Sequence, residues 1–118
     1  MSYGVVKIGG VDVPMTANAA TPIRYNQIFR EGYYKTVTDG TITTEQRIEF
    51  FEKVGFVMAK QAEKADMSKI REEDFFAWLE GFEVNDLINA VDDIADVYQN
   101  NQARESVPKP QAAQPTGR

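Results

Sequence analysis

The chain has 118 residues, which is enough for one small domain with a single core. It contains neither histidine nor cysteine, which excludes cysteine nucleophiles, serine–histidine pairs, histidine general bases and thiolate or imidazole metal sites. Its formal charge of −5 and pI near 4.7 argue against nucleic acid as a partner, because phosphates require a basic surface. No apolar run approaches the roughly 20 residues that span a bilayer, and the N-terminus lacks the layout of a signal peptide. We therefore expect a non-enzymatic, protein-binding domain of the cytoplasm that contacts no membrane.

The N-terminal segment predicts a β-hairpin over residues 3–15. Apolar β-branched residues alternate on both sides of Gly9-Gly10 in the sequence VVKIGGVDV. A Gly-Gly pair supplies the positive φ angles of a tight two-residue turn. Because Pro14 lacks an N–H group, we expect it to limit the second strand and to keep that strand at the edge of the sheet.

Helical signals dominate the rest of the chain. Thr21 followed by Pro22 predicts a helix start with threonine as the N-cap, and Gly32 is the expected end. Thr43 and Gln46 form a predicted capping box before a second helix. Its expected apolar stripe, at spacings of three and four, consists of Ile48, Phe51, Gly55, Met58, Ala62 and Ala65, with Val54 and Val57 beside it.

Two further helices are predicted in the C-terminal half. One opens near Ser68, covers residues 69–80 and ends with Gly81 in the left-handed conformation. It should bury some of Phe75, Phe76, Trp78 and Leu79. The other spans residues 85–101 and directs inward Leu87, Ile88, Val91, Ile94, Ala95 and Tyr98.

The last segment, residues 102–118, reads QARESVPKPQAAQPTGR, with three prolines and one valine as its only large apolar residue. Such a segment cannot bury enough apolar surface to offset the entropy of ordering it. We therefore predict an α+β, mainly α, fold. It consists of one domain over residues 1–101, with a short N-terminal hairpin followed by about four helices, and a disordered tail over residues 102–118.

Asp92, Asp93 and Asp96 spell DDxxD, a motif that holds magnesium and diphosphate in isoprenoid synthases. Aspartates one turn apart on a helix can share a hard cation, but such sites normally need about six or more oxygen ligands. Those enzymes also need a larger helical barrel and a second acidic motif, which this chain does not supply. We therefore predict no metal site and no cofactor, and we interpret the motif as part of a solvated acidic face.

That face also has an interpretation as a surface for a basic partner. Repulsion between like charges one turn apart, as for Asp92 and Asp96, slightly destabilises a helix, so solubility alone could be achieved more cheaply with mixed charges. Plain solvation remains the alternative. The acidic residues of this stretch are Glu80, Glu83, Asp86, Asp92, Asp93, Asp96 and Glu105.

Phe56 is a second candidate for partner binding. On a helical wheel it lies opposite the apolar stripe, so an exposed aromatic ring could act as an interface anchor. The alternative is that another element covers it. Its wheel neighbours are Glu49, Glu52, Lys60 and Glu63. We interpret four further aromatic residues as core residues and not as a platform for base stacking. They are Tyr25, Tyr33, Tyr34 and Trp78.

In the order of its elements, the chain resembles the tail assembly chaperones of long-tailed, siphovirus-type bacteriophages, particularly those of Gram-positive hosts. The resemblance covers most of residues 3–101. It is carried by the segments VVKIGGVDVPM, TPIRYNQIF and EEDFFAWLEGFEVNDLINAVDDIADVYQNN, followed by a short polar tail.

The resemblance implies a protein without catalytic residues in the cytoplasm of a host bacterium. Such chaperones bind the tape-measure protein, help tail-tube subunits polymerise around it, and are absent from the finished virion. The sequence leaves open whether copies of the chain associate as a homo-oligomer. Interaction candidates are the acidic helix face with Asp86, Asp92, Asp93 and Asp96, the side chain of Phe56, and the edge strand of the hairpin.

The resemblance further implies a longer product made by −1 ribosomal frameshifting. Val107, Pro108 and Lys109 permit the slippery heptamer C-CCA-AAA, and a disordered tail would then serve as a linker. Two alternative functions stay open at this point. One is a minor structural tail or connector protein of the virion, and the other is an acidic regulatory binding module.

Overall fold

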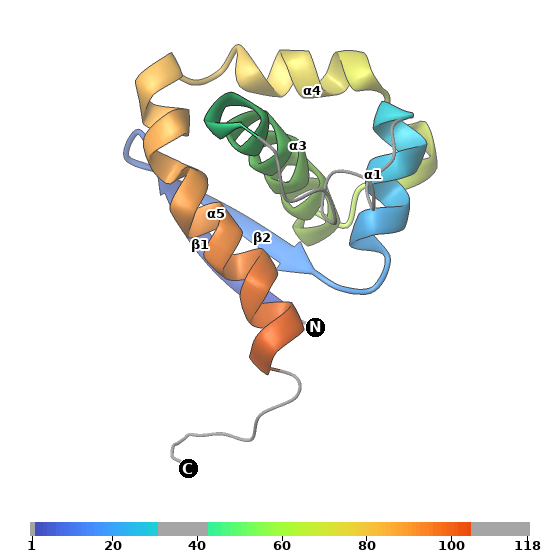
Figure 1. Ribbon diagram of the computed structural model, residues 1–118. Coiled ribbons are helices and arrows are strands. Elements are labelled where there is room, and N and C mark those ends of the chain that lie inside the picture. Colours follow the sequence, from blue (N-terminus) through green and yellow to red (C-terminus); the bar gives the residue numbers. More distant parts are fainter. Residues whose placement is uncertain (1, 31–42, 105–118) are drawn as a thin grey trace.

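The structure is a computed structural model that describes residues 2–30 and 43–104. Figure 1 shows helix α3 running through the middle of the molecule. Helices α1 and α4 lie on one side of α3, and the hairpin and α5 lie on the other. This arrangement confirms the predicted α+β, mainly α, fold with an N-terminal hairpin. No helix in the described ranges is long and apolar enough to cross a membrane.

The hairpin consists of β1 (Ser2–Ile8) and β2 (Val11–Ala17), which pair antiparallel. Gly9 and Gly10 have φ angles of 57° and 84°, as a two-residue primed turn requires. The predicted hairpin is therefore confirmed, although both strands reach beyond residues 3–15.

Pro14 does not limit β2, contrary to the prediction, because β2 continues to Ala17. Ile8 and Val11 flank the two-residue turn and form a hydrogen-bonded pair, and such pairs alternate with non-hydrogen-bonded ones. Val5 and Pro14 therefore form a non-hydrogen-bonded pair. The missing N–H of Pro14 would point away from β1, so its absence leaves the ladder intact.

Helix α1 spans Thr21–Phe29, and its N-cap is Ala20. The prediction that Thr21 caps this helix is wrong, because its side chain is buried and faces the preceding loop, where the Asn18 N–H donates to Thr21 Oγ1 at 3.0 Å. The helix ends in a left-handed residue, Arg30, with φ 56°. Gly32, the predicted end, lies outside the described residues.

Helix α3 spans Thr44–Ala62, and the predicted capping box is confirmed. The Gln46 N–H donates to Thr43 Oγ1 at 3.1 Å, and the Thr43 N–H donates to Gln46 Oε1 at 2.7 Å. The buried side of α3 is wider than the predicted stripe, although Ala62, a member of that stripe, is only half-buried. The buried residues are Phe50, Phe51, Lys53, Val54, Gly55, Phe56, Val57, Met58 and Ala59.

The third predicted helix is divided in two. A 3-10 turn, η1 (Met67–Lys69), precedes α4 (Glu72–Leu79), and the backbone is extended at Arg71 between them. Phe75 is buried, whereas Phe76 is 53 % exposed. Gly81 is not left-handed, contrary to the prediction, since α4 ends at Glu80 in the right-handed helical conformation.

Helix α5 spans Val84–Arg104, three residues beyond the predicted C-terminal end at residue 101. Ile88 is 37 % exposed, so its predicted inward position is wrong, and Ala90 is buried in addition to the other predicted positions. The remaining tail, residues 105–118, lies outside the described residues.

Candidate partner-binding surfaces

Phe56 is fully buried, so its predicted exposure is wrong. Aromatic rings from α1 and α4 cover it, with ring centroids 6.4 Å away at Phe29, 5.6 Å at Phe75 and 5.7 Å at Trp78. The Nζ of Lys60 lies 5.8 Å from the centroid of the Phe56 ring. Phe56 is therefore a core residue, and no partner can reach it in this structure.

The acidic residues of α5 do not form one cluster. Asp92 Oδ1 lies 3.3 Å from Arg47 Nη1 on α3. Asp86 is half-buried and lies against the hairpin turn, because a Cβ atom at Gly9 would come within 2.6 Å of its Oδ2. Asp93 and Asp96 are exposed. Within the described ranges, no group of three or more carboxylate, histidine or cysteine side chains is placed to hold a metal ion.

The outer face of the hairpin presents apolar side chains to solvent. Tyr3 is 63 % exposed and Val5 is 53 % exposed, and Pro14, also exposed, is paired with Val5. The next cross-strand pair on this face is an ion pair, with Lys7 Nζ 3.1 Å from Asp12 Oδ1. Period-two alternation in YGVVKI could have revealed this face, because Gly4, Val6 and Ile8 point inward.

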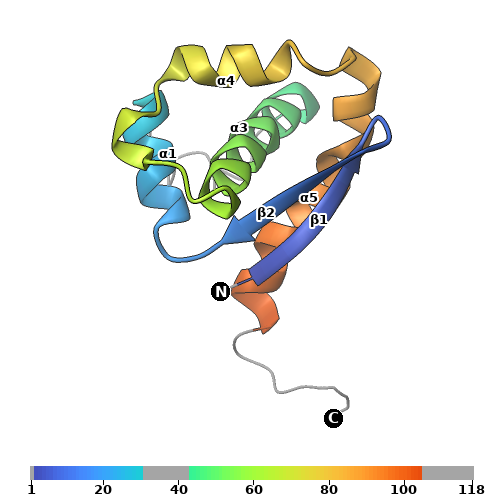
Figure 2. The same ribbon diagram turned by 180° about the vertical axis from the view of Figure 1, so that it is seen from behind.

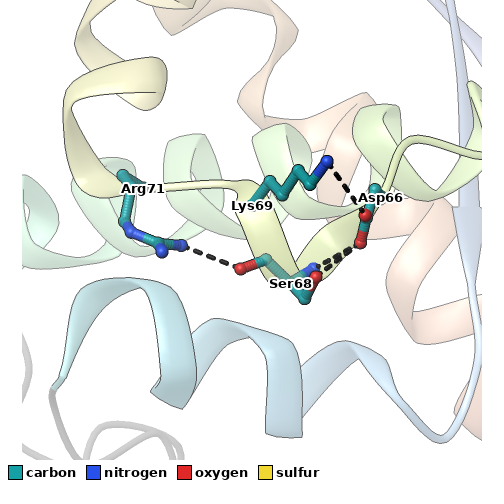
Figure 3. Close-up of polar contacts among 4 residues, drawn as sticks. All are labelled: Asp66, Ser68, Lys69 and Arg71. Atoms are coloured by element: carbon teal, nitrogen blue, oxygen red, sulfur yellow. Dashed lines mark hydrogen bonds and ion pairs between the residues drawn. The ribbon is translucent and has the colours of Figure 1, made fainter.

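A hollow of about 250 Å³ lies between α1 and the segment that leads into α4. Figure 3 shows the polar contacts beside it. The Asp66 carboxylate accepts hydrogen bonds from the Ser68 hydroxyl at 2.6 Å and the Ser68 N–H at 3.1 Å, and these bonds lower the pKa of Asp66 below its ordinary value. Arg71 Nη1 donates to the Ser68 carbonyl at 2.9 Å. The hollow is lined by Arg24, Gln27, Ile28, Met67, Ser68, Ile70 and Arg71.

The guanidinium groups around this hollow are already engaged within the protein. Arg24 Nη1 donates to Gln27 Oε1 at 3.0 Å, and Arg71 Nη1 also reaches the Ile70 carbonyl at 3.2 Å. The Asp66 carboxylate, at the start of the segment that leads into α4, lies 4.0 Å from Lys69 Nζ. These contacts stabilise the turn before α4 and give the polar groups beside the hollow partners within the protein.

The aromatic residues considered for base stacking pack in or against the core. Tyr25 is 1 % exposed, with its ring centroid 5.2 Å from that of Phe29, and Trp78 packs at 5.1 Å against Phe82. This confirms the predicted core packing of both. Tyr33 and Tyr34 lie outside the described residues.

The three segments that carry the family resemblance form distinct parts of the fold. VVKIGGVDVPM lies within the hairpin, TPIRYNQIF forms α1, and the longest segment covers α4 and most of α5. Comparisons of the chain with protein-family models, with curated proteins and with solved structures found no match. Its functional surfaces are therefore inferred from its own residues.

Proposed function

We propose that this protein is a tail assembly chaperone of long-tailed bacteriophages. In this role it binds the tape-measure protein and assists tail-tube polymerisation in the cytoplasm of the host bacterium, without catalysing a reaction. The observation that carries the proposal is the apolar outer face of the hairpin, formed by Tyr3, Val5 and Pro14. A contiguous exposed apolar face of this kind suits a protein that covers apolar segments of another chain.

The proposed mechanism is reversible coating of the tape-measure protein. A small apolar face bordered by the Lys7–Asp12 ion pair favours modest affinity, because small interfaces hold their partners weakly. Modest affinity allows tail-tube subunits to displace the chaperone as the tube grows. The net charge of −5 would keep the coated assembly soluble.

Co-purification of the full chain with separately expressed tape-measure and tail-tube proteins tests the proposal. The double variant Tyr3→Thr/Val5→Thr keeps β-forming residues in β1 while removing apolar surface, and it should bind the tape-measure protein about fivefold more weakly or worse. Ile23→Thr is a control, since Ile23 is 57 % exposed and its helix, α1, lies on the other side of α3 from the hairpin. Absence of binding to both phage proteins by the unaltered chain would refute the proposed function.

Two observations on the phage would separate the alternatives. Mass spectrometry of purified virions should find no copies of the protein, whereas a stoichiometric amount would identify a structural tail or connector component. The nucleotide sequence across codons 107–109 should contain a slippery heptamer and an overlapping −1 frame if a longer product is made. Residues 107–109 lie outside the described part of the chain.

A further inference from the structure

The two outer edges of the hairpin differ in what they offer to another strand. In β2, the outward-pointing backbone groups belong to Asp12, Pro14 and Thr16, which occupy the non-hydrogen-bonded pairs. Pro14 has no N–H group, and the Thr16 carbonyl already accepts a hydrogen bond from Gln61 Nε2 at 2.9 Å. The missing N–H of Pro14 and the bond from Gln61 on α3 therefore leave the edge of β2 an incomplete template for another strand.

The outer edge of β1 is not paired by any element of the described part of the chain. By the same alternation, the N–H and C=O groups of Tyr3, Val5 and Lys7 point away from β2. Within residues 2–30 and 43–104, no further strand pairs with this edge, and no hydrogen bond from another element reaches these backbone groups. A free row of this kind is a template for an added strand.

Helix α5 follows β1 closely along its length behind the hairpin (Figure 2). A Cβ atom at Gly4 would lie 2.8 Å from Val97 Cγ2, and the Ser2 hydroxyl donates to the Val97 carbonyl at 3.0 Å. Meanwhile α3 packs against β2. Neighbouring strands are about 4.8 Å apart whereas packed helices are about 8–10 Å apart. With α3 against β2, these spacings place α5 on the β1 side of the hairpin, where it can provide a floor for a strand added to β1.

That floor is acidic. Asp86 lies against the hairpin turn, and Val97 lies against Gly4, so the α5 face between them follows β1. Asp93 is on this face, because it comes two turns after Asp86 and one turn before Val97. The two carboxylates are about 10 Å apart along the helix axis. Asp92 is rotated by roughly 100° from Asp93 and instead meets Arg47 on α3.

We propose that the edge of β1 and the two carboxylates of Asp86 and Asp93 together bind an extended, basic segment of a partner protein. The segment adds as a third strand, and its backbone hydrogen-bonds to Tyr3, Val5 and Lys7. Lysine or arginine at alternate positions, all on one face of the strand, points down to α5. The intervening side chains lie beside Tyr3 and Val5 on the outer face of the sheet.

A second copy of this chain fits the edge less well than a single segment does. Pairing β1 with β1 from another copy would bring two α5 helices into the same space across the symmetry axis, since each lies on the β1 side of its own hairpin. An extended segment without a helix beneath it meets no such obstacle. The acidic floor adds charge complementarity for a basic segment, which a second copy of β1, with one lysine at its far end, does not match.

The experiment uses the full chain and the synthetic peptide acetyl-TKVKVKT-amide. Binding is followed by NMR at low salt, together with amide hydrogen exchange. When about nine-tenths of the protein is bound, exchange of the Tyr3, Val5 and Lys7 amides should slow by about tenfold. Two control peptides should not give this protection: one has glutamate in place of lysine, and the other has the same composition in the order TKKKVVT.

Matched variants separate edge pairing from general attraction. Asp93→Asn should weaken binding by about two- to fivefold. Asp92→Asn removes the same charge from the neighbouring position and should change it little. Val5→Pro should abolish binding but preserve exchange protection of Val6 and Ile8, because its lost N–H points outward as that of Pro14 would. If Val5→Pro unfolds the hairpin, the comparison of Asp93→Asn with Asp92→Asn still tests the inference.

Several results would overturn the inference. One is peptide binding without protection of the three edge amides, and another is equal weakening by Asp92→Asn and Asp93→Asn. Lack of binding at millimolar peptide would also overturn it. Protection of the same amides in the free protein, rising with protein concentration, would identify a second copy as the occupant. None of these outcomes involves a phage protein, so the inference stands or falls independently of the proposed chaperone function.

Discussion

Helices α3 and α5 are of similar length, 19 and 21 residues, yet their neighbours cover them differently. Every residue from Phe50 to Ala59 on α3 is buried except Glu52. On α5, a single stripe is buried, and the opposite side carries exposed aspartates. The difference follows from position, because α1, α4, α5 and the hairpin all pack against α3. Hydrophobic periodicity therefore predicts the buried residues of a helix that is covered on one side. It underestimates the number of buried residues in a helix that other elements enclose.

Charged residues around the middle of α3 are compatible with this enclosure because their long stems are apolar. Lys53 is 7 % exposed; its Nζ lies 2.9 Å from Glu49 Oε2 and 5.2 Å from the centroid of the Phe29 ring. Lys60 extends over the ring of Phe56 in the same way. A helical wheel counts these lysines as solvent-facing, whereas their stems cover aromatic rings.

Truncating Phe56, which lies on the side of α3 opposite the predicted apolar stripe, should have the largest effect on stability. Phe56→Ala removes a fully buried ring that contacts three other aromatic rings, and it should lower the free energy of unfolding by about 3–5 kcal/mol. Ile88→Ala on α5, at a 37 % exposed site, should cost less than about 1 kcal/mol. Chemical denaturation measures both. Similar small losses for the two variants would show that α3 is not enclosed.

Added side-chain volume at the contact between α3 and α5 should destabilise the protein. A Cβ atom at Gly55 would lie 3.1 Å from Ile94 Cδ1 and 3.5 Å from Met15 Cε. Gly55→Val should therefore destabilise the protein by about 1–3 kcal/mol through overpacking, measured as a shift in the denaturation midpoint. Ile94→Ala in the same chain should restore part of this loss relative to the sum of the single changes. Simple additivity would mean that Gly55 and Ile94 are not in contact.

The sequence was sufficient for features determined locally. Thr43 and Gln46 cap α3 as predicted, and Gly9-Gly10 makes the turn, since both depend only on residues close in the chain. The burial of Phe56 could not be predicted, because its cover comes from α1 and α4, which are distant in sequence. The role of Pro14 is also local, because the two-residue turn at Gly9-Gly10 sets the register that pairs Pro14 with Val5. For the candidate site, the charges of Asp86 and Asp93 were predictable, but their position beside the open edge of β1 was not.

A smaller effect concerns the one half-buried residue in the enclosed part of α3. Burial, with a contribution from the Glu49 charge, raises the pKa of Glu52 above its ordinary value. The folded state therefore favours the protonated carboxyl, and ionisation destabilises folding as pH rises through the folded-state pKa. Glu52→Gln should make the protein more stable than the unaltered chain at pH 7, with the difference disappearing below the unfolded-state pKa of about 4.3. Lower stability of the variant at pH 7 would contradict this assignment.

The smallest effect is expected on the exposed side of α5, where Asp92 meets Arg47. The two atoms are 3.3 Å apart, but the aspartate side chain is 86 % exposed, so water and salt screen the pair. Asp92→Asn also removes repulsion from Asp96 one turn later, which opposes the loss of the ion pair. The net change in unfolding free energy should stay within about 0.5 kcal/mol and shrink further in high salt. A loss above about 1 kcal/mol would mean that α5 depends on its acidic side for folding, and the contrast with α3 would weaken. A negligible loss would show that the ion pair between Asp92 and Arg47 contributes little to the stability of the fold.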